Sequence, residues 1–591
     1  MSDKEKGAFP SQKELEREIS EYLSNKYGRK VRIVSAGHFP VVDPEEGEEA
    51  GAATAERERF RFDLTPEELI AYLDQYVVGQ SEAKAVLATK ICTHFNRISR
   101  SLNRPGAARD DGRNVGRIKN NVLLIGPTGV GKTFLIKLIA RHIGVPFVKG
   151  DATKFSETGY VGGDVEDLIR DLVREADNDL ERARFGIVYL DEVDKIAGGE
   201  LRRGLDVSRS GVQRALLKPM EETEVEMKVP HDPVSMIEAV EHYRLTGKRR
   251  RQTVNTRHIL FIMSGAFNGL EEIIRRRLQQ RSIGFESTVA AADGGKSGLF
   301  LKKVKAEDLV DYGFESEFIG RLPVLAVLDE LSEDDLYQIL SNPNSSVVVS
   351  KKQDFRAYGI ELRFEEEALR RLARLAARER TGARALVSVV ERVLLHFERK
   401  LPSTDIRHLV VDGGLVADPA GTLVKLLKDS RHRQRQVKRC ADLAAKELQS
   451  LSAFIASRLG EYLESHDVLP TPARLEMMAR EAQDDDLDPA EVCERFVELV
   501  GLINQRADRI AHNFGVDLSF SDEAVDRILA RQPRDQATVG EVCDQILGAM
   551  EYGLRLLGQR QDAPQLVVTA AGIDAPDQFI NRVVSQTFKL D

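Results

Sequence analysis

A glycine-rich loop followed by lysine and threonine has the clearest chemistry in this sequence. Residues Gly126 to Thr133 read GPTGVGKT, which fits the pattern G-x-x-x-x-G-K-[ST] and directly follows the apolar run NVLLI. Glycines let backbone N–H groups curl around phosphates, and the next stretch, FLIKLIARHI, predicts a helix whose positive N-terminal end faces them. The residues expected to bind a nucleotide are Gly126, Pro127, Thr128, Gly129, Val130, Gly131, Lys132, Thr133 and Phe134.

Two side chains of this loop suit phosphate and metal chemistry. Lys132 should neutralise the β- and γ-phosphates of a nucleoside triphosphate. The Thr133 hydroxyl should be a ligand of Mg²⁺, together with nucleotide oxygens and water. We therefore predict ATP and Mg²⁺ as cofactors. Chance matches to the pattern occur, but rarely with a strand before the loop and a helix after it.

Two acidic residues end a second apolar run, GIVYLDE, which extends from Gly186 to Glu192. Ligands of parallel sheets lie at the carboxyl ends of the strands, where Asp191 and Glu192 would be. We expect Asp191 to hold Mg²⁺ through water and Glu192 to polarise the attacking water as a general base. The alternative is that this acidic pair only caps the next segment.

A hydroxyl ends a third apolar run. The run extends from His258 to Met263 and is followed by Ser264. At that place a polar side chain can sense the γ-phosphate and help to position water. The alternative is a serine that merely terminates the strand.

The elements that must position these residues are strands of one sheet. Short apolar runs between stretches of helical periodicity are typical of strands that are buried on both faces of a parallel sheet. With 591 residues the chain is too long for a single core. We predict an α/β P-loop domain with a parallel sheet, a helical α+β lid domain, and a mainly helical C-terminal extension with a second lid-like unit. The expected boundaries are 1–60 for an N-terminal element and flexible linker, 61–330 for the α/β ATPase domain, 331–427 for the lid, 428–512 for a helical linker and 513–591 for a degenerate lid-like repeat.

An internal repeat supports the second lid-like unit. The segment YGIELRFEEEALRRL from Tyr358 is similar to FGVDLSFSDEAVDRIL from Phe514, and HLVVDGG later in the first copy is matched by QLVVTAAG. Chance similarity of two amphipathic helices is the alternative, but ordered agreement at both ends favours duplication. The second copy has RDQATV where the first has TGARAL, which places Ala537 opposite Arg384. We expect no hydrolytic function in the second copy.

The composition argues against several classes of protein. A hydrophobic fraction of 42%, with no apolar run long enough to cross a bilayer and no secretory signal in MSDKEKGAFPSQKELEREIS, predicts a soluble cytoplasmic protein. The net charge of -9 disfavours nonspecific binding to nucleic acid. Neither a membrane nor a nucleic acid is expected as a partner. The four cysteines lie singly, without histidines at metal spacing, so neither structural zinc nor disulfides are expected.

From about Leu64 to Leu427 the chain resembles the ClpX-type AAA+ protein unfoldases. The resemblance is carried by LTPEELIAYLDQYVVGQSEAKAVLA, GPTGVGKT, DATKFSETGYVGGDVEDLI, GIVYLDEVDKIA, ILFIMSGAFNGL, EFIGRLPVLAVLDELSE and TGARAL. It implies that Val77 and Val78 line the adenine and that Arg321 is an arginine finger reaching the γ-phosphate of a neighbouring subunit. Arg384 then corresponds to a second sensor that links the nucleotide state to the lid. Each arginine taken alone could form a surface salt bridge.

The resemblance also implies an assembly and its partners. A homo-oligomer, by resemblance a hexamer, would thread unfolded or tagged proteins through its pore. Tyr160 and Val161 of GYVG match the pore loop that grips substrate, where an aromatic residue can press on polypeptide of any sequence. Ile283, Gly284 and Phe285 resemble the tripeptide by which such unfoldases dock on the ClpP peptidase.

The sequence departs from the family at both ends. Residues 1–60 contain no cysteine, so the family's four-cysteine zinc domain is not expected there, and the extension after about residue 428 has no counterpart in ordinary ClpX. Delivery of substrates to ClpP therefore competes with a protease-independent remodeller of one dedicated partner. A DNA-directed AAA+ motor is disfavoured by the net acidity. HslU shares GYVG, but the SIGF segment and the short insertion after Asp194 argue against it.

Overall fold

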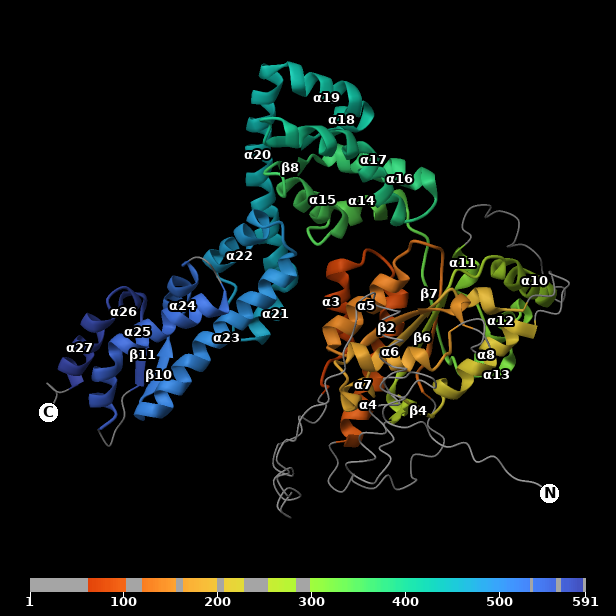
Figure 1. Ribbon diagram of the computed structural model, residues 1–591, viewed down its shortest axis with the longest axis horizontal. Coiled ribbons are helices and arrows are strands. Elements are labelled where there is room, and N and C mark those ends of the chain that lie inside the picture. The colour runs from red at the N-terminus through yellow and green to blue at the C-terminus, as the bar shows by residue number, and fades with distance from the viewer. Residues whose placement is uncertain are drawn as a thin grey trace, which may run out of the picture. The chain divides into compact units, whose positions relative to one another are not determined.

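The computed structural model describes residues 62–102, 119–155, 163–198, 207–227, 253–282, 298–531, 535–559 and 565–587. The chain divides into two compact units, Met1–Arg61 and Phe62–Asp591. All the elements described here belong to the second unit (Figure 1).

A five-stranded parallel sheet forms the centre of the first part of this unit. Its strands are β1 (Val122–Ile125), β2 (Phe147–Asp151), β3 (Ile187–Asp191), β6 (Leu260–Gly265) and β7 (Val324–Val327), in the spatial order β2-β3-β6-β1-β7. Every residue of β1 and β6 is buried, because helices cover both faces of the sheet. The strand β1 lies between β6 and β7, neither of which follows it directly in the chain. The order of the sheet therefore reverses at β1.

Helices and short turns surround the sheet, as Figure 1 shows. One face of the sheet, with Leu123, Val188 and Phe261, belongs to a large apolar cluster that includes Leu168 and Leu216 of the covering helices. The elements around the sheet are α3 (Pro66–Tyr76), α4 (Ser81–Leu102), α5 (Lys132–Ile143), η1 (Ala152–Lys154), α6 (Asp167–Glu175), α7 (Leu180–Ala183), η2 (Val193–Ile196), α8 (Val207–Met220), β4 (Glu224–Glu226), β5 (Thr253–Asn255), η3 (Thr256–His258), α10 (Leu270–Ser282), α11 (Gly298–Leu301), α12 (Ala306–Tyr312) and α13 (Ser316–Gly320).

The third strand differs from its predicted limits. We expected a strand from His258 to Met263, but His258 ends the 3-10 turn η3 and β6 continues through Ser264. The cause is local, because the side chain of Asn255 accepts the N–H of Arg257 and caps η3. As a result Ser264 is a buried member of the sheet.

A smaller helical unit, which we call the lid, follows β7. A capping box at Ser332 and Asp335 begins α14, and the two strands β8 and β9 pair in parallel. The apolar core of the lid contains side chains from its helices, including Leu336, Leu372, Leu386 and Phe397. The elements are α14 (Glu333–Ser341), α15 (Ser346–Arg356), β8 (Glu361–Phe364), α16 (Glu366–Glu379), α17 (Arg384–Lys400), η4 (Leu401–Ser403), β9 (His408–Val411), α18 (Gly413–Ala417) and α19 (Pro419–Lys428).

The C-terminal part begins with long helices and repeats the order of the lid. The strands β10 and β11 pair in parallel like β8 and β9, and each is followed by helices in the same sequence as in the first copy. The elements are α20 (Ser430–Phe454), the π-helical turn η5 (Ile455–Leu459), α21 (Gly460–Ser465), α22 (Pro472–Asp484), α23 (Pro489–Phe514), β10 (Asp517–Phe520), α24 (Asp522–Leu529), α25 (Gln536–Leu557), β11 (Gln565–Val568), α26 (Ala570–Asp574) and α27 (Pro576–Thr587).

The fold class predicted from the sequence is confirmed. The α/β part has a parallel sheet, and the region after it is largely helical with small two-stranded sheets. In the described part of the chain, none of the helices has the length and apolar character needed to cross a membrane.

Candidate nucleotide-binding site

The glycine-rich loop joins β1 to α5 at the point where the strand order reverses. Gly129 has a φ of 81° and Gly131 a φ of 94°, a left-handed conformation that glycine adopts most readily. Gly131 is the N-cap residue of α5 and supplies no side-chain cap, so the first N–H groups of this helix are available to an anion. The loop thus has the geometry of a phosphate cradle at the expected edge of the sheet.

Lys132 is the first residue of α5 and lies against the loop. Its Nζ donates hydrogen bonds to the backbone oxygens of Gly126 at 2.6 Å and Pro127 at 2.8 Å. Burial lowers the pKa of Lys132, the carboxylates of Asp191 and Asp194 oppose that change, and the charge of Arg384 adds to it. An incoming phosphate would restore favourable charge around this buried ammonium group.

Four oxygen-bearing side chains meet on the face of the sheet that α5 covers. The hydroxyl of Ser264 donates to Asp191 Oδ1 at 2.6 Å and also lies 2.7 Å from the hydroxyl of Tyr189. The Thr133 hydroxyl is 3.1 Å from the Tyr189 hydroxyl and 3.4 Å from Asp191 Oδ2. Side chains alternate between the faces of a strand, so Tyr189 and Asp191 share one face of β3. The structure therefore brings Thr133, Asp191 and Ser264 together.

Lys149 of β2 completes this cluster and was not identified from the sequence. Its Nζ lies 3.1 Å from Asp191 Oδ2 and 3.4 Å from the Thr133 hydroxyl. Burial raises the pKa of Asp191, but hydrogen bonds from Ser264 and Lys149 and the charge of Lys149 outweigh it, so the net shift of the pKa is downward. Asp191 is thereby held as a carboxylate.

The same oxygens suit a magnesium ion. Thr133 and Asp191 offer a hydroxyl and a carboxylate, which belong to the hard oxygen ligands that Mg²⁺ prefers. They already converge on one cation, the ammonium group of Lys149. The residues that would hold the metal are thus Thr133 and Asp191, and the ion would supply charge neutralisation of the β- and γ-phosphates.

Glu192 follows the end of β3 in a strained conformation. Its φ is 58°, in the left-handed region, which costs a residue with a Cβ about 1–3 kcal/mol. Its backbone N–H donates to Asp191 Oδ1 at 3.1 Å, and its side chain is exposed. This turn separates the two carboxylates, so that Asp191 stays in the oxygen cluster while Glu192 is exposed to solvent.

The segment expected to contact the adenine follows α3. Val77 is buried and caps α3, and Val78 is partly exposed. The side chain of Gln80 donates to the backbone oxygen of Asp329 and accepts its N–H, each at 2.8 Å. Asp329 lies between β7 and α14. The Val77–Val78 segment is therefore tied to the connection between the α/β part and the lid.

The lid contacts the phosphate loop directly. The backbone N–H of Ala383 donates to the oxygen of Gly129 at 2.9 Å, and Arg384, the next residue, begins α17. A Cβ at Gly129 would lie 2.0 Å from the backbone oxygen of Thr381. The loop and the turn before α17 are thus in backbone contact.

Replacement of Gly129 by alanine should destabilise the nucleotide-free chain more than replacement of Gly131 does. Both positions share the positive-φ cost, but a Cβ at Gly131 meets nothing within 4 Å. The extra clash at Gly129→Ala should cost about 1–3 kcal/mol. Thermal unfolding without nucleotide compares the two variants. Equal unfolding temperatures would show that the lid turn does not rest on the loop.

Arg321 lies at the end of α13, just before β7. Its side chain is 46% exposed and pairs with Glu221, and its backbone oxygen accepts a hydrogen bond from Asn121 Nδ2 at 3.1 Å. A surface pair of this kind contributes at most about 1 kcal/mol. The guanidinium can therefore be released to another partner at little cost.

Two groups of predicted residues lie outside the described part of the chain. These are Tyr160 and Val161 of the expected pore loop, and Ile283, Gly284 and Phe285 of the expected docking segment.

Tyr189 and Lys149 are members of this cluster that were not predicted from the sequence. Tyr189 could have been found from strand periodicity, because it is two residues before Asp191 and must share its face. Lys149 gave no such signal. Its place follows from the pairing of β2 with β3, where Lys149 is opposite Tyr189.

Comparisons with known proteins identify the family to which this chain is similar. A family model described as an AAA domain (Cdc48 subfamily) matches residues 117–325, and one described as the C-terminal, D2-small domain of ClpB protein matches residues 331–397. Two similar curated relatives are the ATP-dependent Clp protease ATP-binding subunits ClpX of Borrelia duttonii (strain Ly) and Borrelia recurrentis (strain A1). Each is 39% identical over 355 residues, which cover 59% of this chain and 77% of the relative.

Proposed function

Because this chain belongs to the ClpX family of AAA+ ATPases, we propose that it unfolds proteins by threading polypeptide through the pore of a ring, at the expense of ATP. The observation that carries the proposal is the contact between the phosphate loop and the lid. A backbone hydrogen bond between Ala383 and Gly129 joins the loop proposed to bind phosphate to the lid. Nucleotide turnover in this pocket would therefore change the position of the lid.

In the proposed mechanism the chain's own residues divide the work. The loop amides and Lys132 hold the phosphates, Thr133 and Asp191 hold Mg²⁺, and Glu192 accepts a proton from the attacking water. Ser264 and Tyr189 keep the Asp191 carboxylate in one orientation through short hydrogen bonds. Arg384, whose charge lowers the pKa of Lys132, would report the phosphate charge to α17.

The ring is proposed to be a homohexamer in the cytoplasm. Among the residues that the structure describes, Arg321 pairs with Glu221 in a salt bridge that is accessible to solvent, as a residue that reaches a neighbour's γ-phosphate requires. Phosphoryl transfer gains most when a guanidinium is supplied at the transition state. Hydrolysis would thus depend on contact between subunits.

Replacement of Tyr160 by alanine should separate ATP turnover from mechanical work. The aromatic ring is proposed to press on the polypeptide in the pore, so its loss should stop unfolding while ATP hydrolysis continues. Loss of fluorescence from a tagged fluorescent protein measures unfolding, and phosphate release measures hydrolysis. The Tyr160→Phe variant, which keeps the ring, is the control. Unfolding at the wild-type rate by Tyr160→Ala would remove the pore-loop assignment.

We propose two alternative roles for the unfolding activity. In the first, Ile283, Gly284 and Phe285 dock the ring on a ClpP peptidase, as the name of the relatives, ATP-binding subunit of a Clp protease, suggests for them. In the second, the chain remodels one dedicated partner without a protease. The folded C-terminal part favours the second, because it adds a complete lid-like unit with its own apolar core. Copurification of a peptidase from the native host distinguishes the two.

A further inference from the structure

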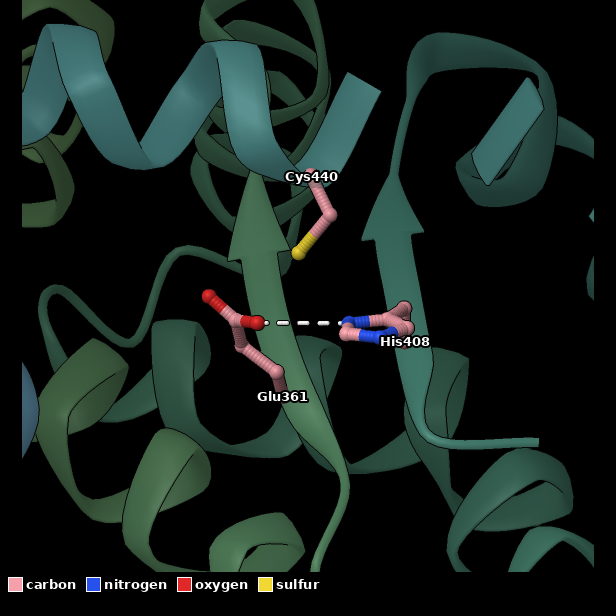
Figure 2. A group of neighbouring side chains, drawn as sticks. All are labelled: Glu361, His408 and Cys440. Atoms are coloured by element: carbon pink, nitrogen blue, oxygen red, sulfur yellow. Dashed lines mark hydrogen bonds and ion pairs between the residues drawn. The ribbon is translucent and has the colours of Figure 1, made fainter. Parts of the chain in front are cut away.

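Three side chains of different chemistry meet where the helix α20 covers the small sheet of the lid. Glu361 begins β8, His408 begins β9 and Cys440 lies on α20. Their ligand atoms all lie within 4.8 Å of one another. Figure 2 shows the three side chains pointing toward one another, with the carboxylate and the imidazole closest. We propose that Glu361, His408 and Cys440 form a binding site for a divalent transition metal of the zinc class.

The register of the sheet explains why two of the ligands meet. Glu361 and His408 are direct partners in the parallel pair β8 and β9. Side chains of paired residues leave the sheet on the same face. His408 Nδ1 lies 3.2 Å from Glu361 Oε2. The distance is already close to the separation of two ligands on one tetrahedral metal ion.

The third ligand is positioned by a helix that is anchored to the same sheet. The side chain of Gln436 accepts the N–H of Val410 at 2.9 Å, and Arg439 Nη1 donates to Asp412 Oδ2 at 3.0 Å. Cys440 is one residue beyond Arg439, on the face that α20 turns to the lid, and it is 1% exposed. Rigid elements therefore deliver all three ligands.

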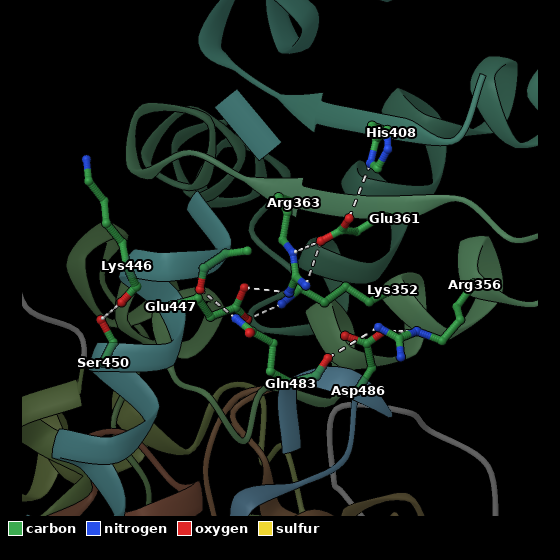
Figure 3. A network of polar contacts seen from close by, with 11 residues as sticks. Lys352, Arg356, Glu361, Arg363, His408, Lys446, Glu447, Ser450, Gln483 and Asp486 are labelled. Carbon is green, nitrogen blue, oxygen red and sulfur yellow. Dashed lines mark hydrogen bonds and ion pairs between the residues drawn. The ribbon is translucent and has the colours of Figure 1, made fainter. Parts of the chain in front are cut away.

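A second layer of charge holds the carboxylate in place. Arg363 donates to Glu361 Oε1 from Nε at 3.0 Å and from Nη2 at 2.9 Å, and its Nη1 donates to Glu447 of α20 at 2.7 Å. Figure 3 shows this network continuing from Glu447 to Lys352. Both of these Arg363 donors bind Oε1, whereas Oε2 is the carboxylate oxygen that lies near His408 Nδ1. Such outer partners orient metal ligands in known sites.

The ligand set selects the class of metal. Thiolate and imidazole together favour zinc and similar ions over Mg²⁺ or Ca²⁺, which prefer oxygen. The side chains of His408 and Glu361 are 35% and 33% exposed, so an ion and a water ligand have a path to the site. A metal binds cysteine as a thiolate, so an ion bound here would release the thiol proton of Cys440.

The second lid-like unit provides an internal comparison. At the corresponding pair of its sheet, Asp517 lies opposite Gln565. The imidazole of the first copy is thus replaced by an amide. Among the described residues, only α26 and α27 follow β11, so no long helix like α20 follows it to supply a thiol. The metal ligands belong to the copy that joins α20, where an ion would fasten the C-terminal part to the lid.

Cobalt binding to the untagged full-length chain tests the proposal. After removal of metals with a chelator, Co²⁺ should produce a thiolate-to-metal charge-transfer band in the near ultraviolet that saturates at a single equivalent per chain. Zn²⁺ should displace the cobalt and abolish the band. The nucleotide site cannot produce this signal, because Thr133 and Asp191 offer only oxygen.

Matched variants assign the band to the three residues. Cys440→Ser should remove it, whereas Cys493→Ser and Cys543→Ser, which alter equally buried thiols elsewhere, should retain it. His408→Gln copies Gln565 of the second unit and should weaken cobalt binding at least about tenfold. Zn²⁺ should raise the unfolding temperature of the wild type but not that of Cys440→Ser.

Two results would overturn the proposal. The first is the absence of a charge-transfer band in a wild-type chain that hydrolyses ATP, which would leave Glu361 and His408 with only the hydrogen bond between them. The second is a band that survives in Cys440→Ser.

Discussion

The Glu192→Gln variant should bind ATP and Mg²⁺ with near wild-type affinity and hydrolyse ATP about 10²–10⁴-fold more slowly. Glutamine has the shape of glutamate and can still hydrogen-bond water, but it cannot accept a proton. The backbone turn that exposes Glu192, with its φ of 58°, does not depend on the charge of the side chain. Phosphate release measures the rate, and titration with a fluorescent nucleotide measures binding.

The control for this prediction is Lys132→Ala. Lys132 supplies a buried positive charge at the phosphate loop, so its loss should weaken nucleotide binding as well as hydrolysis. A Glu192→Gln chain that hydrolyses ATP within tenfold of the wild-type rate would show that another group activates the water. The Glu192→Gln chain, loaded with ATP, should retain bound substrates and partners.

The Arg321→Ala variant should lose about 10³-fold or more in ATP hydrolysis although its own nucleotide pocket is intact. Arg321 is proposed to act on the γ-phosphate of a neighbouring subunit, so the defect lies between chains. The structural cost of the change should be small. In the described part of the chain the only ion pair of Arg321 is with Glu221, and that pair is exposed. Nucleotide binding and thermal stability should therefore stay close to those of the wild type.

Mixing two inactive variants tests action between subunits. A Lys132→Ala subunit has no functional pocket but carries an intact Arg321, which it can offer to the pocket of an Arg321→Ala neighbour. A mixture of the two should therefore recover part of the ATPase activity that each lacks alone. Arg321→Lys, which keeps the charge but not the planar fork, is a useful comparison because lysine should rescue poorly. If the mixture stays inactive although mixed rings form, Arg321 does not act in trans.

The fold class and the family were accessible from the sequence. Apolar runs such as NVLLI and GIVYLD predicted buried parallel strands, and the structure has them as β1 and β3. The motifs from GPTGVGKT to TGARAL indicated the ClpX family, which the relatives confirm. These features are local in the chain, so periodicity and spacing are enough to find them.

The proposed metal site shows why other features were out of reach. The sequence predicted no zinc, because no histidine or cysteine lies at metal-ligand spacing from Cys440 in the chain. Its neighbours Glu361 and His408 come from two strands whose pairing is set by the packing of the whole lid. Ligand spacing is a reliable signal only when one loop or one helix carries the ligands.

The sequence by itself determined which residues could carry phosphate and acid–base chemistry, because those residues lie in contiguous motifs whose backbone conformation is local. Only the tertiary structure decided that Lys149 joins Asp191, that Gly129 lies against Thr381, and that α20 brings a thiol to the lid sheet. The physical reason is that strand register and helix packing depend on burial of apolar side chains far apart in the chain. The polar groups that this packing brings together leave no pattern in the sequence.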